Sequence, residues 1–256
     1  MEFSSRKMRN SILTGTGFAF FTLGTVQSLA ATETSSFERK QQAWSQLNYY
    51  SPTEGFHSKG SYGLHVGIGA VAPTASAEAS GSATASENPE LHELEQPKPR
   101  VFISKGTPWP VDFGASLSIL EGKNARQGGA HVQWTLFEDF QLPSIALRAS
   151  RSMLTNFHEV KNLTTDAVEL GMSYSLIRYI IVSVSASEQW ETGQTQAKGE
   201  LLSLTEIDLP EWKTRRTVYS WGISVNPFTP FVQIGVEQSY TSKKAQTSLA
   251  KVSFLL

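Results

Sequence analysis

The sequence predicts an all-β protein, an up-and-down antiparallel transmembrane β-barrel of about ten strands, with eight or twelve strands as alternatives. Three observations predict this fold class. Apolar and polar residues alternate in about ten segments, each of which predicts a strand of roughly 9–11 residues. Tight and long connections alternate between these segments. The polar faces are mostly Ser, Gly, Thr and Gln, which cannot pack a dry core, so we expect the apolar faces to contact lipid.

The alternating segments follow one another without a long helical pattern between them. Val168–Leu176 is typical, because Val168, Leu170 and Met172 alternate with Glu169, Gly171 and Ser173. The segments are 62–70, 111–119, 130–136, 145–150, 168–176, 180–187, 218–225, 232–239 and 250–256, with a weaker one at 100–107. Most are longer than the strand of about 5–6 residues that is usual in soluble proteins.

The connections predict which ends of the strands lie together. Tight connections fall at 107–110, 138–143, 177–179 and 226–230, and longer ones at 72–99, 121–128, 156–164, 191–213 and 241–246. Outer-membrane barrels have short periplasmic turns and longer outside loops, and a single bacterial chain usually has an even number of strands. Ten strands starting from the periplasm return the chain to the periplasm at Leu256.

Composition narrows the class of protein. The chain has 256 residues, 39% of them hydrophobic, which fits one large all-β domain without helical membrane spans. A net charge of −1 gives no broad basic surface, so we expect no nucleic-acid partner. The absence of cysteine excludes disulfides and thiolate-bound zinc, and the five histidines have no metal-ligand spacing. The sequence predicts no cofactor.

Residues 1–30 predict a secretory signal peptide. Arg6, Lys7 and Arg9 precede an uncharged, moderately apolar stretch that ends in small residues, and cleavage is expected after Ala30. A membrane anchor helix is the alternative interpretation of this segment. Residues 31–60 are polar and predict a periplasmic N-terminal extension, within which Phe37, Trp44 and Leu47 align on a short amphipathic helix.

Residues 61–256 form the predicted barrel, which contains one low-complexity outer loop at 72–99. This loop is rich in Ala, Ser, Thr and Glu, a composition that cannot bury enough apolar surface to fold alone. We expect a surface loop that is available for contacts with partners.

Taken together, the signal peptide, the ten alternating segments and the final strand SLAKVSFLL resemble the small bacterial outer-membrane β-barrel proteins. The resemblance covers nearly everything from Gly60 onward. It implies the outer membrane of a Gram-negative bacterium, with its lipids and lipopolysaccharide as partners. Such proteins commonly end on an aromatic residue, whereas Phe254 is followed here by Leu255 and Leu256.

The polar faces contain charges that should point into the lumen. Arg148 and Glu169 fall on neighbouring strands at similar heights, and so do Glu237 and Lys251; Asp112 lies closer to the tight turns. Pairing is expected because an unpaired charge in a narrow interior is costly. The polar lumen residues are His131, Gln133 and Gln233, and the aromatic girdle is Tyr62, Tyr174, Trp190, Tyr219 and Tyr240.

These features predict a structural barrel or a narrow channel for small solutes, with loops exposed at the surface. One alternative is a secreted soluble β-sandwich or a lipocalin-like binding protein. A second is a hydrolase at the barrel rim, for which His131, or His158 with Glu159 and Asp166, would be candidates. These residues form no recognisable motif, so no catalytic residue is predicted.

Overall fold

The computed structural model describes residues 37–51, 54–61, 63–74, 93–121, 124–139, 142–177, 179–198, 206–208, 211–227, 231–241 and 246–256. The predicted signal peptide and Tyr62 of the predicted girdle lie outside the described residues. No helix in the described ranges is long and apolar enough to cross a membrane.

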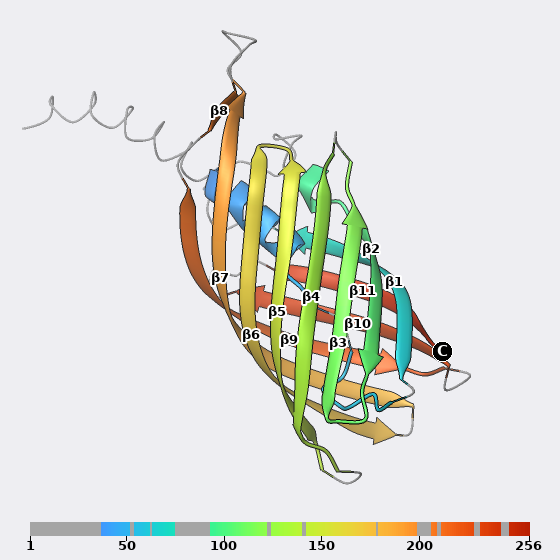
Figure 1. The fold of residues 1–256 in the computed structure, drawn as a ribbon. Helices are drawn as coiled ribbons and strands as arrows, with labels where there is room; N and C mark the ends of the chain where they lie inside the picture. The colour runs from blue at the N-terminus through green and yellow to red at the C-terminus, as the bar shows by residue number, and fades with distance from the viewer. Residues whose placement is uncertain are drawn as a thin grey trace, which may run out of the picture.

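The fold is a closed, ten-stranded, antiparallel up-and-down barrel, as the sequence predicts. Neighbours in the sequence pair with one another, and the pairing of β1 with β11 and of β6 with β7 leaves no open edge in the ring (Figure 1). The short β8 pairs only with the end of β7 and stands outside the ring. The strands are β1 (Leu64–Thr74), β2 (Lys98–Gly106), β3 (Val111–Ile119), β4 (Arg126–Phe137), β5 (Ser144–Phe157), β6 (Val160–Ile177), β7 (Ile180–Lys198), β8 (Glu206–Asp208), β9 (Trp212–Val225), β10 (Val232–Thr241) and β11 (Gln246–Leu255).

Large apolar side chains cover the outside of the ring. On β6, Val168, Leu170, Met172, Tyr174 and Leu176 are exposed, whereas Glu169, Gly171 and Ser173 between them are buried on the inner face. Other strands repeat this pattern; their exposed apolar residues include Ile68, Val101, Ile103, Phe113, Leu117, Val132, Trp134, Ile145, Leu147, Val184, Trp221, Ile223, Ile234, Val236 and Phe254. A closed sheet with this outer surface contradicts the alternative of a soluble β-sandwich, whose apolar faces would pack inside.

Several strands are longer than the sequence predicts. β6 has 18 residues and β7 has 19, because most of 156–164 and part of 191–213, predicted as loops, continue the strand pairing. Phe157 pairs with Val160, so only two residues connect β5 to β6. Similarly, 72–74 belong to β1 and 98–99 to β2, so the predicted loop 72–99 is shorter, and most of it lies outside the described residues. These segments form strands through backbone pairing with their neighbours, although their polar composition predicted loops.

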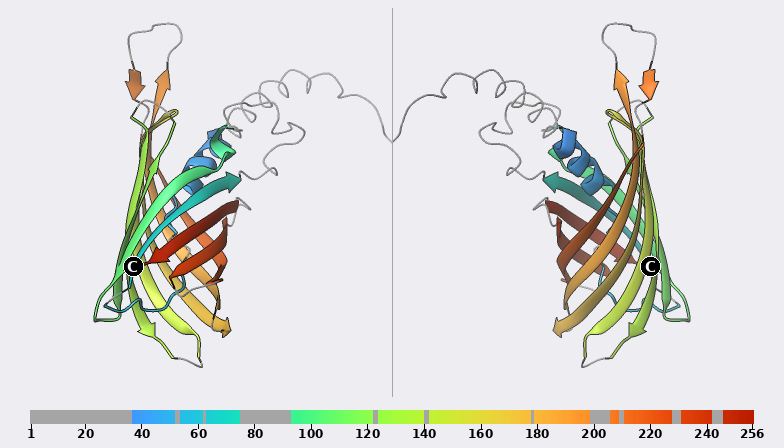
Figure 2. Two further views of the ribbon diagram at one scale, coloured as in Figure 1. Left: turned by 90° about the vertical axis from the view of Figure 1, so that its right-hand side faces the viewer. Right: turned by 90° about the vertical axis from the view of Figure 1, so that its left-hand side faces the viewer.

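The N-terminal extension is where the structure corrects the prediction most. Residues 37–48 form the expected helix, but the helix and the residues that follow it lie inside the barrel rather than in the periplasm. We call residues 37–51 and 54–61 the lumen segment. Figures 1 and 2 show the helix at the end of the barrel from which β8 projects.

The lumen segment runs from one mouth of the barrel to the other. Near its start, Lys40 pairs with Glu159, in the β5–β6 turn at the long-loop end, at 2.9 Å. Near its finish, the backbone N–H of Lys59 donates to Asp112, which follows the tight β2–β3 turn, at 3.1 Å. The chain therefore crosses the lumen from the long-loop end to the short-turn end before β1 begins.

An apolar cluster holds the helix at the long-loop end. Trp44 and Leu47 are fully buried against inward side chains of β5 and β6, including Leu154, Phe157 and Leu163. Leu94, in the short helical turn 93–95, joins this cluster from the end of the predicted outer loop. The strand extensions that sequence analysis interpreted as loops therefore form the walls around this helix.

Candidate functional site

The interior of the barrel holds the predicted lumen residues and contacts the lumen segment along its length. Glu237 and Gln233 are half-buried and line the interior from β10. The other predicted residues on the inner face are buried: Asp112, His131, Gln133, Arg148, Glu169 and Lys251. Ser, Thr and Gln occupy most of the remaining inner positions.

Arg148, on β5, contacts side chains of both neighbouring strands of the wall, β4 and β6. Its Nη1 donates to Glu169 Oε2 at 2.8 Å, so the predicted pair is brought together. Its Nη2 donates to Gln133 Oε1 at 2.7 Å, and its guanidinium lies 4.4 Å from the ring centroid of Phe56 in the lumen segment. Glu169 also accepts from Ser185 at 2.5 Å. The charges are thus satisfied by partners, as a low-dielectric interior requires.

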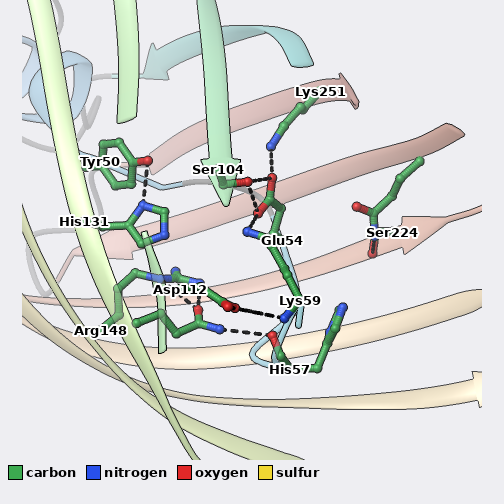
Figure 3. Close-up of polar contacts among 12 residues, drawn as sticks. Tyr50, Glu54, His57, Lys59, Ser104, Asp112, His131, Arg148, Ser224 and Lys251 are labelled. Atoms are coloured by element: carbon green, nitrogen blue, oxygen red, sulfur yellow. Dashed lines mark hydrogen bonds and ion pairs between the residues drawn. The ribbon is translucent and has the colours of Figure 1, made fainter. Parts of the chain in front are cut away.

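Lys251 has a partner that sequence analysis missed. It donates to Glu54, a buried carboxylate of the lumen segment. Glu54 also pairs with Lys59 and accepts from Ser104 of β2 at 3.1 Å (Figure 3). The acidic residue on β10, Glu237, accepts instead from Ser51 at 2.5 Å. No strand pattern marks Glu54, because it lies outside the alternating segments.

Backbone groups of the lumen segment are also held by the wall. Arg100, on β2, donates to the carbonyl oxygens of Tyr49 at 2.9 Å and Leu47 at 2.5 Å. Ser152 Oγ donates to the backbone carbonyl of Asn48 at 2.5 Å. The side-chain Nδ2 of Asn48 donates in turn to the backbone carbonyl of Ser152 at 3.4 Å. Arg100 lies in the weak candidate strand, which is why its inward direction was not predicted.

Two inward glycines leave room for rings of the lumen segment. A Cβ at Gly171 would overlap the ring of Phe56, and one at Gly129 would overlap that of Tyr50. The Tyr50 hydroxyl lies 2.7 Å from His131 Nδ1. The wall is therefore shaped for these side chains, and its small residues do not simply border open space.

The histidines considered for a rim enzyme have separate surroundings. His131 is buried against Tyr50 inside the barrel, and His158 Nε2 lies 3.5 Å from Glu93. Asp166 pairs with Arg151 on the outer surface at 3.4 Å. Among the described residues, no three His, Asp or Glu side chains are placed to hold a metal ion.

A cavity remains at the short-turn mouth, beside the end of the lumen segment. Its volume is about 330 Å³. The charged and polar residues on its lining are His57, Ser58, Lys59, His65, Asn226 and Gln233. Lys59 therefore borders this cavity and also pairs with Glu54.

Aromatic residues on the outer surface lie toward both ends of the barrel. Tyr219 and Tyr240 are exposed directly opposite each other, Trp190 is exposed nearer the long-loop end, and Tyr174 is exposed near the β6–β7 turn. The exposed aromatics near the short turns that the prediction omitted are Trp109, Trp134, Phe137, Tyr179, Phe231 and Phe254. The outward ion pairs Arg151–Asp166 and Arg215–Glu188 lie toward the long-loop end.

Comparisons with known proteins concern the fold alone. No family model and no curated protein matches the sequence. The structure is similar to the KdgM porin in complex with disordered oligogalacturonate, with a TM-score of 0.40, 10% identity, and coverage of 74% of this chain and 98% of that chain. It is similar to Ail, the attachment invasion locus protein of Yersinia pestis (0.38, 8%, 75% and 95%). It is also similar to Omp33 of Acinetobacter baumannii (0.34, 10%, 79% and 100%).

Proposed function

We propose that this chain is an outer-membrane channel for small polar solutes, held closed by its own lumen segment. The observation that carries the proposal is the nature of the contacts between wall and segment. Below the apolar cluster of the helix, they are mainly hydrogen bonds and ion pairs, from Arg100, Ser104, Asp112, Ser152 and Lys251. Water can replace such contacts, each of which contributes about 0.5–1.5 kcal/mol when neutral and about 1.5–3 kcal/mol when it involves a charged group.

The outer surface supports a place in the membrane. On β6, apolar residues face outward from Val168 to Leu176, and Asp166 ends this stretch. At about 3.3 Å per residue and a tilt of about 40°, the stretch covers about 20 Å of the barrel axis, close to the band of about 25 Å in outer-membrane barrels. In this proposal, the exposed side chains of Arg151 and Arg215 at the long-loop end are available to lipopolysaccharide phosphates.

A closed structural barrel is the second candidate, and one observation favours it. Trp44, Leu47, Leu154, Phe157 and Leu163 form an apolar cluster inside the long-loop end. Exposing that cluster to water would be costly, at about 1.5–3 kcal/mol for each large side chain. In this second candidate the lumen segment is a permanent core and the barrel never conducts.

Conductance of the full chain in planar bilayers tests the two candidates. Because the sequence has no cysteine, the double variant Asn48→Cys/Ser152→Cys introduces a single crosslink between the helix end and the wall. These two residues already touch through two hydrogen bonds. We expect brief openings in the reduced variant and none after oxidation.

The two single-cysteine variants are the matched controls, and oxidation should leave their openings unchanged. Openings that persist in the crosslinked barrel would show that the lumen segment does not close the channel. If neither the native chain nor the reduced variant ever opens over the full voltage range, the channel proposal fails and the closed structural barrel is supported.

A further inference from the structure

We propose that Lys251 and Ser104 form a binding site for the carboxylate of a small solute, and that Glu54 occupies this site when the barrel is closed. The inference rests on the proposed channel function, because it requires that Glu54 can leave. It goes beyond that function by assigning a chemical class to the solute. Figure 3 shows the side chains concerned.

The carboxylate of Glu54 marks the position of the site. Lys251 and Lys59 both pair with it, and Ser104 Oγ lies 3.2 and 3.1 Å from its two oxygens. Glu54, Ser104 and Lys251 are 6%, 3% and 3% exposed, so the contacts are made away from bulk solvent. Charge-assisted hydrogen bonds of this kind are stronger than neutral ones. Lys59 belongs to the lumen segment and Lys251 to β11, so departure of the segment takes Glu54 and Lys59 away and leaves the ammonium group of Lys251 on the wall.

The surrounding wall extends this positive character. Arg100 on β2 and Lys251 on β11 both lie opposite Gly69 of β1, on either side of that strand. Since glycine has no side chain, β1 places nothing between the two cations. The lumen segment supplies the carbonyls of Leu47 and Tyr49 to Arg100 and the carboxylate of Glu54 to Lys251, while Ser118 of β3 also accepts from Arg100 at 3.3 Å. Departure of the segment therefore removes two acceptors of Arg100 and the Glu54 carboxylate from Lys251.

The cavity at the short-turn mouth provides a place from which a solute can compete with Glu54. Lys59 borders this cavity of about 330 Å³ and contacts Glu54. The size lies at the small end of pockets that hold organic ligands. His57 and His65 line the same cavity and can donate hydrogen bonds to an anion. A small carboxylated solute arriving there meets Lys59 first and Lys251 next.

The test uses the full chain with Glu54→Ala and sodium acetate as the probe. The substitution removes Cγ, Cδ and both carboxylate oxygens, and acetate supplies the same four heavy atoms. We expect the barrel-to-unfolded transition, followed by the electrophoretic shift on heating, to occur at a lower temperature in the variant. Acetate at about 100 mM should raise that temperature by about 2–4 °C, whereas acetamide at the same concentration should not.

Two comparisons make the result specific. The native chain, whose site is filled by Glu54, should show no rise with acetate over chloride at equal ionic strength. Glu54→Ala/Lys251→Met should also show none, and Glu54→Ala/Ser104→Ala should show a smaller rise than Glu54→Ala alone. An equal rise of the unfolding temperature in all of these proteins would show that acetate acts only as a salt, and it would overturn the carboxylate site.

Conductance separates this inference from the channel proposal. We expect Glu54→Ala to open at least tenfold more often than the native chain, and acetate to reduce those openings. If the variant binds acetate but never conducts, the channel proposal fails while the carboxylate site stands. If it conducts but acetate changes neither its openings nor its unfolding temperature, the carboxylate site fails alone.

Discussion

At the scale of single residues, the interior of this barrel depends on charges that have specific partners. Arg148 contacts Glu169, Gln133 and the ring of Phe56, so it joins two wall strands to the lumen segment. Removal of one member of such a set leaves the other charge buried without compensation.

Arg148→Ala should therefore be strongly destabilising. We expect a loss of about 3–5 kcal/mol in the free energy of unfolding, measured by urea titration in detergent, because Glu169 would remain buried without its cation. The matched control is Arg151→Ala, on the same strand but in an exposed pair with Asp166, where about 0–1 kcal/mol is expected. Equal losses in the two variants would contradict the importance of the buried pair.

Gly171 tests whether the wall is shaped for the lumen segment. Gly171→Leu places a side chain where the ring of Phe56 lies, so the segment should be displaced and openings should become more frequent in planar bilayers. The heat-dependent electrophoretic shift should persist, since the ring of strands is not altered. Gly128→Ala, which meets only ordinary contacts, should behave as the native chain. Unchanged conductance in Gly171→Leu would speak against a displaceable segment.

At the scale of elements, helix 37–48 has its own anchor at the long-loop end. Trp44→Ala should weaken its docking by about 3–5 kcal/mol, because a fully buried indole would leave a cavity against the inner wall. Hydrogen exchange of the helix amides should accelerate, while the amides of β1 and β11 stay protected. Glu38→Ala, at an exposed position of the same helix, should have little effect on this exchange. Simultaneous loss of protection in helix and strands would mean that they unfold as one unit.

The period-two pattern predicted most strands well, and it failed at their ends. Segments such as 168–176 alternate strictly because one face meets lipid and the other the interior. Beyond the membrane band this contrast disappears, and Thr164, Thr165 and Asn162 resemble loop residues although they pair with β5. His158 and Glu159 form a two-residue turn without the Asn-Gly or Asp-Gly signature of tight hairpins.

The content of the lumen could not be predicted from the wall. An inner face of Ser, Thr and Gln has the same sequence pattern whether it meets water or a polar segment of the chain. A signal was nevertheless present: Leu154, Phe157 and Leu163 are inward apolar residues, which water would not favour. Combined with the amphipathic helix at 37–48, they could have indicated that the helix lies inside.

At the scale of the whole molecule, the outer and inner tryptophans should respond differently to lipid. Variants that retain Trp134 alone or Trp44 alone, with the others changed to Phe, can be placed in bilayers with brominated acyl chains. We expect strong fluorescence quenching for Trp134, which is 54% exposed on the outer surface, and little for Trp44, which is fully buried inside. Quenching of both to the same degree would contradict the placement of the helix within the barrel.

The path of the chain from the long-loop end to β1 restricts how the bore can be emptied. A sealed ring offers no sideways exit, and the segment is tethered to β1 at the opposite mouth. If it were pulled outward, its tethered part would still thread the bore, so only retraction toward the tether clears it. During this retraction, residue 37 and any chain attached ahead of it must pass through the pore. A folded domain wider than the pore, fused ahead of residue 37, should block this retraction. Single-channel recordings of the fusion should then show a barrel that never opens.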